Sequence, residues 1–148
     1  MSISNLQENL ENGTFVITTE IGPPKGVNVE TCIDEAEEYL KERCTAVNVT
    51  DNQSSVMRFG SMAACRFLLD RGIEPVLQMV CRDRNSIALQ SDALSAYGLG
   101  IRNVLAITGD HQSLGDHPQT AGVFDLDSVG LLQALTGLEN GKDLSGND

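Results

Sequence analysis

Two carboxylates, Glu20 and Asp110, are the residues of this sequence best suited to acid–base chemistry. Glu20 follows an apolar, β-rich segment that ends at Thr19, and Asp110 stands just beyond a second such segment, 103–107. Ligands of parallel α/β folds bind at the carboxyl ends of the strands, so both side chains are expected at one rim. Two carboxylates that converge there could divide the roles of acid and base between them if their surroundings differ.

Two further apolar segments also end in polar residues. Thr50 and Asp51 follow the segment 45–49, while Arg82 and Arg84 follow the segment 75–81. Either arginine could meet a phosphate or a carboxylate, although a solvated loop is the favoured interpretation. His111 and His117, beyond the last of the four segments, are interpreted as surface loop residues.

The elements that would position these residues alternate between strands and helices. Strands are expected over 14–19, 45–49, 75–81 and 103–107, and helices over 29–43, 55–70, 86–97 and 127–135. The strands recur about every 30 residues, the size of one βα unit. Apolar strands that alternate with amphipathic helices predict a parallel sheet with covered faces. Asn48 and Gln78 are the polar exceptions inside the strands, and Asn28 is the expected N-cap of the first helix.

Two architectures satisfy this order of elements. A dinucleotide-binding sheet would carry GxGxxG after its first strand, but Glu20-Ile21-Gly22-Pro23-Pro24 stands there instead. A (β/α)8 barrel needs about 250 residues, and four units are half of one. The expected fold is therefore α/β, the first four units of a TIM (β/α)8 barrel in a truncated half barrel. Residues 1–13 are interpreted as an N-terminal extension, 14–136 as the partial barrel and 137–148 as a polar tail.

Composition excludes several classes of protein. The net charge of −11 argues against nucleic acid or an anionic membrane as a partner, because both require a basic surface. No CxxC pair is present, so neither a zinc site nor a redox pair is expected. No apolar run approaches the roughly 20 residues of a membrane span, and no signal peptide is evident, so the cytoplasm is the default location. Cys32, Cys65 and Cys81 are interpreted as packed free thiols.

Three stretches of the sequence resemble one enzyme family. Thr18-Thr19-Glu20-Ile21-Gly22-Pro23-Pro24-Lys25 resembles the first-strand motif of methylenetetrahydrofolate reductases, and Asn48-Val49-Thr50 resembles their second-strand exit. The segment 100–110, which ends in Gly109-Asp110, resembles their fourth-strand motif. The resemblance covers about residues 14 to 135, in the right order and at the right spacing.

The resemblance implies a barrel that binds FAD and reduces 5,10-methylenetetrahydrofolate to 5-methyltetrahydrofolate by hydride transfer. Glu20 would be the general acid that helps to open the bridging five-membered ring, which it can do only while it holds a proton. The alternative for Glu20 is a salt bridge, for example with Lys25. Asp110 would lie beside the flavin and the pterin and favour a cationic intermediate, with helix capping or solvation as the alternative.

The resemblance also implies a set of cofactor-binding positions. Gly109 would let the backbone approach the cofactor closely, and Thr50 would offer a hydroxyl. Gln78 stands where many members place a histidine, Thr108 where some have arginine, and Asp51 where others have an aromatic residue. Asp125 falls in a region that contacts FAD in relatives. Cofactor-binding candidates are therefore Thr50, Asp51, Gln78, Thr108, Gly109, Asp110 and Asp125, and Glu20 and Asp110 are the catalytic and substrate-binding candidates.

The resemblance leaves several questions open. Later strands of family members supply further flavin and folate contacts and the nicotinamide surface, so this chain alone is expected to be inactive, and unstable unless two halves pair. NADH, NADPH, or a ferredoxin or flavoprotein partner could supply the electrons, and a homo-oligomer is allowed. Two rival functions are a pterin-binding methyltransferase-type barrel without flavin, and a non-catalytic half-barrel subunit that binds folate or a partner.

Overall fold

Four parallel strands form the centre of the molecule, in a computed structural model that describes residues 3–148. They are β1 (Thr18–Ile21), β2 (Ala46–Val49), β3 (Pro75–Val80) and β4 (Asn103–Ile107), hydrogen-bonded in the order β1-β2-β3-β4. The register places Glu20 opposite Asn48 and Gln78 opposite Leu105. Sequential order with parallel pairing is the arrangement of four barrel units, which confirms the expected fold class.

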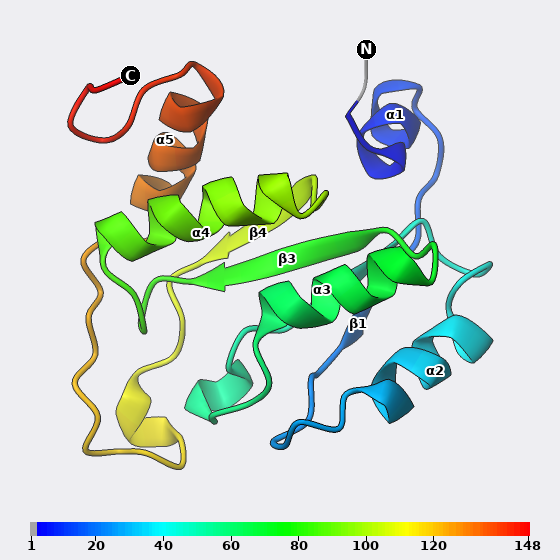
Figure 1. The fold of residues 1–148 in the computed structure, drawn as a ribbon, viewed down its shortest axis with the longest axis horizontal. Helices are drawn as coiled ribbons and strands as arrows, with labels where there is room; N and C mark the ends of the chain where they lie inside the picture. The colour runs from blue at the N-terminus through cyan, green and yellow to red at the C-terminus, as the bar shows by residue number, and fades with distance from the viewer. Residues whose placement is uncertain (1–2) are drawn as a thin grey trace.

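A helix follows each strand. These helices are α2 (Glu30–Tyr39), α3 (Ser61–Asp70), α4 (Ser86–Gly98) and α5 (Ser128–Glu139), and α3 crosses in front of β1 in Figure 1. A short helix α1 (Asn5–Glu11) precedes the sheet, and the 3-10 turns η1 (Gln53–Ser55) and η2 (Gln112–Leu114) lie in the loops after β2 and β4. Within residues 3–148, no helix is long and apolar enough to cross a membrane.

The core lies between the helices and one face of the sheet. Val47, Val49, Leu77 and Met79, which alternate along β2 and β3, pack with buried residues of the helices. The opposite face carries no helix in the described part of the chain, and Leu105 on it is 42% exposed. β1 and β4 each pair on one side only, so the sheet is not closed. This uncovered face would line the interior of a closed barrel.

Four element boundaries differ from the sequence-based expectations by more than two residues. β1 begins at Thr18 rather than 14, and Phe15 is 89% exposed. α2 ends at Tyr39 rather than 43, and its N-cap is Val29 without a side-chain hydrogen bond, so Asn28 was the wrong cap. α3 starts at Ser61 rather than 55, because Ser54 and Ser55 have positive φ values that no α-helix accommodates. α5 continues to Glu139, past the expected start of the tail.

The cysteines are all free, and they differ in burial. Cys65 and Cys81 are buried as expected, and burial raises the pKa of the Cys65 thiol to about 12. Cys32 was expected to be buried but is partly exposed, with its Sγ 3.9 Å from the Gly22 carbonyl oxygen.

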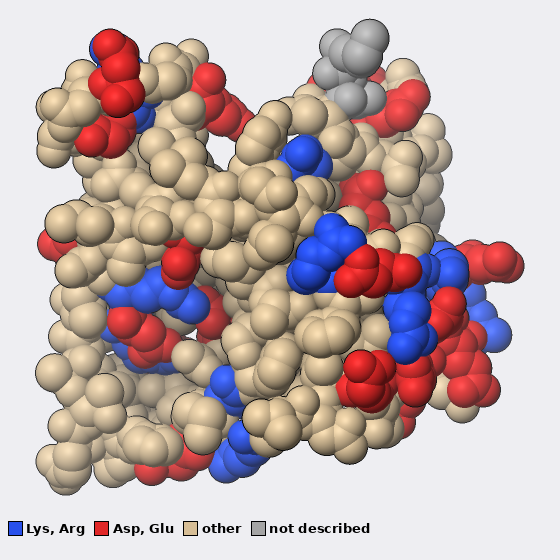
Figure 2. All heavy atoms as spheres, viewed as in Figure 1, with Lys and Arg blue, Asp and Glu red and all other residues tan. Residues whose placement is uncertain are grey.

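Acidic side chains of α2 gather with basic side chains that follow α2 and end α3 (Figure 2). Arg71, the C-cap of α3, pairs with Glu30, Asp34 and Glu37 of α2 at 3.3, 2.8 and 2.7 Å. The Arg71 hydrogen bond is the largest cause of a lowered pKa at Glu37. These exposed pairs fasten α2 to α3, each with a small contribution to stability.

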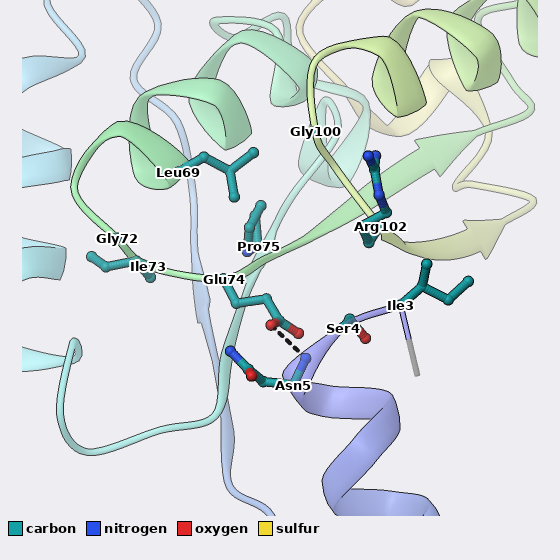
Figure 3. A pocket seen from close by; sticks show the side chains of 10 residues that line it. All are labelled: Ile3, Ser4, Asn5, Leu69, Gly72, Ile73, Glu74, Pro75, Gly100 and Arg102. Carbon is teal, nitrogen blue, oxygen red and sulfur yellow. Dashed lines mark hydrogen bonds between the residues drawn. The ribbon is translucent and has the colours of Figure 1, made fainter. Parts of the chain in front are cut away.

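The N-terminal edge of the sheet holds a cavity of about 310 Å³ beside the start of α1 (Figure 3). Glu74, just before β3, accepts hydrogen bonds from the backbone N–H groups of Asn5 and Leu6 at 2.8 and 2.9 Å. It also accepts one from the side-chain amide of Asn103 at 2.9 Å. Glu74 therefore anchors the first turn of α1 to the sheet. This edge lies opposite the carboxyl ends of the strands, where barrel residues serve stability rather than chemistry.

We expect Glu74→Gln to loosen α1 without unfolding the sheet. The change replaces one carboxylate oxygen by an NH2 group, which cannot accept from a backbone N–H, at a cost of about 1–2 kcal/mol. Hydrogen exchange at the Asn5 and Leu6 amides should then become faster, while the β3 amides keep their protection. Glu38→Gln, on the exposed surface of α2, is the matched control. Unchanged exchange at Asn5 and Leu6 would show that Glu74 does not anchor the helix.

Candidate active site

Three polar side chains from adjacent strands form a hydrogen-bonded group on the uncovered face. Asn48 of β2 donates its Nδ2–H to Glu20 Oε2 of β1 at 2.8 Å, and Gln78 of β3 donates its Nε2–H to the same oxygen at 3.1 Å. We call Glu20, Asn48 and Gln78 the carboxylate clamp. Glu20 is exposed, whereas Gln78 is only 8% exposed. The clamp joins three strands, and both donors meet one oxygen of the carboxylate.

The alternative role considered for Glu20, a salt bridge to Lys25, is wrong. Lys25 instead pairs with Asp116 at 3.0 Å, and Asp116 also accepts from His117 at 2.8 Å and from the Met57 N–H at 3.3 Å. The hydrogen bond from His117, followed by that from Lys25, lowers the pKa of Asp116. The loop after β4 therefore reaches back to the loops after β1 and β2. His117 and His111 are exposed, as expected.

Two buried polar atoms beside the clamp have no hydrogen-bond partner within residues 3–148. They are Asn48 Oδ1 and Thr50 Oγ1, and Thr50 is 2% exposed. Asn48 and Thr50 alternate with Val49, so both side chains leave β2 on the uncovered face. Unpaired buried polar atoms are costly, and binding sites are where such atoms receive their partners from a ligand.

Asp51 supports the end of β3 and the loop that follows it. It is 3% exposed and accepts hydrogen bonds from the Val80 N–H at 3.0 Å and from Arg84 at 2.6 Å. Arg84 also pairs with Asp92 of α4 at 2.9 Å. Arg84 thus lies between two carboxylates, and the expectation that it belongs to a solvated loop is wrong.

Asp51→Asn should cost about 2 kcal/mol of unfolding free energy, because it removes the negative charge that pairs with Arg84 in a buried place. Asp92 still pairs with Arg84, which keeps the loss below that of an isolated buried charge. Asp34→Asn, whose exposed carboxylate pairs with Arg71, should cost less than about 1 kcal/mol. Urea unfolding of both variants measures the difference. Equal losses would contradict the supporting role of Asp51.

Arg82 connects the ends of three strands. It is 2% exposed, and its guanidinium donates to the carbonyl oxygens of Asn52 and Asp110, both at 3.2 Å. It also pairs with Asp83 at 2.7 Å. Burial opposes ionisation of Asp83, but the hydrogen bonds from Arg82 and Asn52 outweigh it and lower its pKa. The interpretation of Arg82 as solvated is therefore wrong, because this side chain holds the loops after β2, β3 and β4 together.

Gly109 and Asp110 follow β4 at the same edge. The φ of Gly109 is +94°, and a Cβ atom there would lie 2.3 Å from Val80 Cγ2 and 3.3 Å from Arg82 Cβ. Only glycine fits this close approach between the loop after β4 and β3. Asp110 is exposed, and its backbone carbonyl, which accepts from Arg82, fixes its position.

Thr108 and Asp125 contact the first turns of helices. Thr108 Oγ1 accepts from the Ser128 N–H, the first residue of α5, at 3.0 Å. Asp125 accepts from the Ser86 N–H of α4 at 2.8 Å, and hydrogen bonds from Ser86 lower its pKa. Both residues therefore cap backbone donors that a helix start leaves free.

Glu20 and Asp110 lie at one edge of the sheet, but Glu20 is on the first strand and Asp110 is in the loop after the last strand. A cavity of about 210 Å³ at this edge is lined by the loops after β2, β3 and β4, and neither carboxylate lines it. Its lining residues are Asn52, Ser55, Val56, Met57, Arg82, Asp83, Gln112, His117 and Thr120. The fold thus brings both carboxylates to the expected rim without joining them.

Comparison with known proteins identifies the family of the chain. A model of the family described as methylenetetrahydrofolate reductase matches residues 5–136, a range that includes all four strands, the carboxylate clamp and Asp110. No curated protein matches the chain. Since the family match covers most of the 148 residues, the chain belongs to the methylenetetrahydrofolate reductase family.

Proposed function

We propose that this chain binds FAD against its uncovered sheet face and acts in the reduction of 5,10-methylenetetrahydrofolate to 5-methyltetrahydrofolate, with Glu20 as the general acid. The carboxylate clamp is the observation that carries this proposal. It holds one carboxylate at the carboxyl edge of a parallel sheet, next to two buried polar atoms that have no partner among residues 3–148. Family membership supplies the class of reaction.

The residues of this face fit a flavin ring. A flavin presents N–H and carbonyl groups along one edge and an apolar ring surface. Asn48 Oδ1 can accept a hydrogen bond, and Thr50 Oγ1 can donate or accept one. Leu105, 42% exposed on the same face, offers apolar contact to a ring. Thr50, Gln78, Gly109 and Asp110 are the residues proposed to hold FAD, which would supply the hydride once the electron donor has reduced it.

Glu20 has one oxygen available for proton transfer. Asn48 and Gln78 both donate to Oε2, so Oε1 is left to carry the proton. Passing this proton to the folate nitrogen that leaves the bridging methylene breaks the carbon–nitrogen bond and produces an iminium cation. The carboxylate of Asp110 favours that positive charge and can accept N–H groups of the pterin. The cation is neutralised when its carbon receives the hydride.

The proposed role of Asp51, Thr108 and Asp125 is to hold the edge of the sheet that binds FAD. Each uses its side-chain oxygen to hold a loop or a helix start. They would affect FAD binding indirectly, because they fix the positions of Val80, Ser128 and Ser86. The electron donor is proposed to be NADH, NADPH or a reduced redox protein, and an assay should supply each in turn.

A titration with FAD tests the proposal. We expect quenched flavin fluorescence on binding, and about tenfold weaker binding by Thr50→Val, which keeps the shape of the side chain and removes its hydroxyl. Thr136→Val, on the exposed surface of α5, is the matched control and should bind as the unaltered chain does. A folded chain that binds 5-methyltetrahydrofolate but not FAD would favour the methyltransferase-type function. A folded chain that binds neither 5-methyltetrahydrofolate nor FAD would favour the non-catalytic half-barrel subunit.

A further inference from the structure

Asn48 differs from other polar residues of the sheet because its two amide atoms have different surroundings. A carboxylate only accepts hydrogen bonds, so the atom 2.8 Å from Glu20 Oε2 must be the amide nitrogen. The oxygen of the same amide then points away from Glu20, and it is buried without a partner within the described residues. The orientation of this side chain is therefore set by Glu20.

We infer that Asn48 is a positioning residue for Glu20: it acts with Gln78 to bind Oε2 and so selects Oε1 as the oxygen that carries the proton. The inference rests on the proposed function, because it assigns a role to Asn48 in presenting that acid. Two donors from different strands restrict rotation of the carboxyl group more than one donor would. Glu20 itself lies on an edge strand and is exposed, so little else restricts it.

Gln78 alone would hold Glu20 less firmly. Its hydrogen bond is 3.1 Å long and spans two strands, whereas the 2.8 Å bond of Asn48 comes from the residue in register on the neighbouring strand. Hydrogen bonds to a charged group contribute more than those between neutral groups. Removal of the Asn48 donor should thus allow the carboxyl group to turn, and expose both oxygens to ligand and water.

Side-chain amide resonances test the clamp in the chain without flavin. In ¹H–¹⁵N spectra of the labelled chain, the NH2 signals of Asn48 and Gln78 should shift together as the pH is changed, since both amides donate to one oxygen. In Glu20→Gln neither signal should titrate. Asn103 is an internal control, because its amide donates to Glu74 and should titrate identically in both proteins. An Asn48 signal that ignores pH, or still titrates in Glu20→Gln, would overturn the clamp.

Kinetics of the FAD-loaded chain, completed by the later barrel strands that family members supply, test the positioning role. Asn48→Leu should lower kcat about tenfold and move the alkaline limb of the pH–rate profile to higher pH, because the ionised carboxylate loses a hydrogen-bond donor that stabilises it. In a Glu20→Gln background, Asn48→Leu should change kcat no further. A lowered kcat with an unmoved alkaline limb would mean that Asn48 is merely structural. If neither the unaltered protein nor the variants reduce folate with any electron donor, the proposed function is wrong. The clamp is still supported in that case if the Asn48 and Gln78 amide signals shift together.

Discussion

Gly109→Ala is expected to destabilise the chain by about 3 kcal/mol and to abolish FAD binding at concentrations that saturate the unaltered chain. The new methyl group would lie 2.3 Å from Val80 Cγ2, on a residue buried in β3, and the φ of +94° disfavours any side chain. The loop must therefore move away from β3 and take the backbone of Asp110 with it. Denaturant unfolding and an FAD titration measure the two effects.

Gly98→Ala is the matched control for this prediction. A Cβ atom at Gly98 meets no atom within 4 Å among the described residues, and the position is the last residue of α4. Alanine there should be neutral or stabilise the helix by up to about 1 kcal/mol. If Gly109→Ala behaves like Gly98→Ala, the close approach of the loop to β3 is not needed for the fold or for the site.

The fold could be predicted where the spacing of apolar residues follows one regular pattern, of either a strand or a helix. β4 lies over 103–107 as expected, and β3 and α4 differ from expectation by one residue each, because apolar runs and helical spacing are local signals. The segment 52–55 could not be predicted. Three of its four residues have positive φ, although none is glycine. This segment contacts η2, which lies about 60 residues farther along the chain, so its conformation depends on the folded structure.

The candidate site was predicted in part. The positions of Glu20 and Asp110 at one edge follow from the rule that parallel strands end together. Arg82 was interpreted as solvated because a charged residue after a strand usually is, and its burial depends on three loops that meet only in the folded chain. Asn48 carried a detectable signal, an amide inside an apolar strand, but its partner Glu20 lies 28 residues away.

Glu20→Gln should lower the rate of folate reduction about 10³-fold while FAD binding stays nearly unchanged. Glutamine keeps the size of the side chain, and its oxygen can still accept from Asn48 and Gln78, so the clamp geometry survives. It cannot release a proton to the folate nitrogen. Glu38→Gln, which removes an exposed carboxylate of α2, controls for the change in net charge and should retain full activity.

A single-turnover experiment measures this directly. The chain, completed by the later barrel strands that family members supply and loaded with FAD, is compared with its Glu20→Gln variant. Both proteins are reduced without oxygen and mixed with 5,10-methylenetetrahydrofolate, and reoxidation of the flavin is followed by absorbance. We expect rapid reoxidation with formation of 5-methyltetrahydrofolate in the unaltered chain, and reoxidation about 10³-fold slower in the variant. Equal reoxidation rates in two proteins that bind FAD equally well would contradict the assignment of Glu20 as the acid of this site.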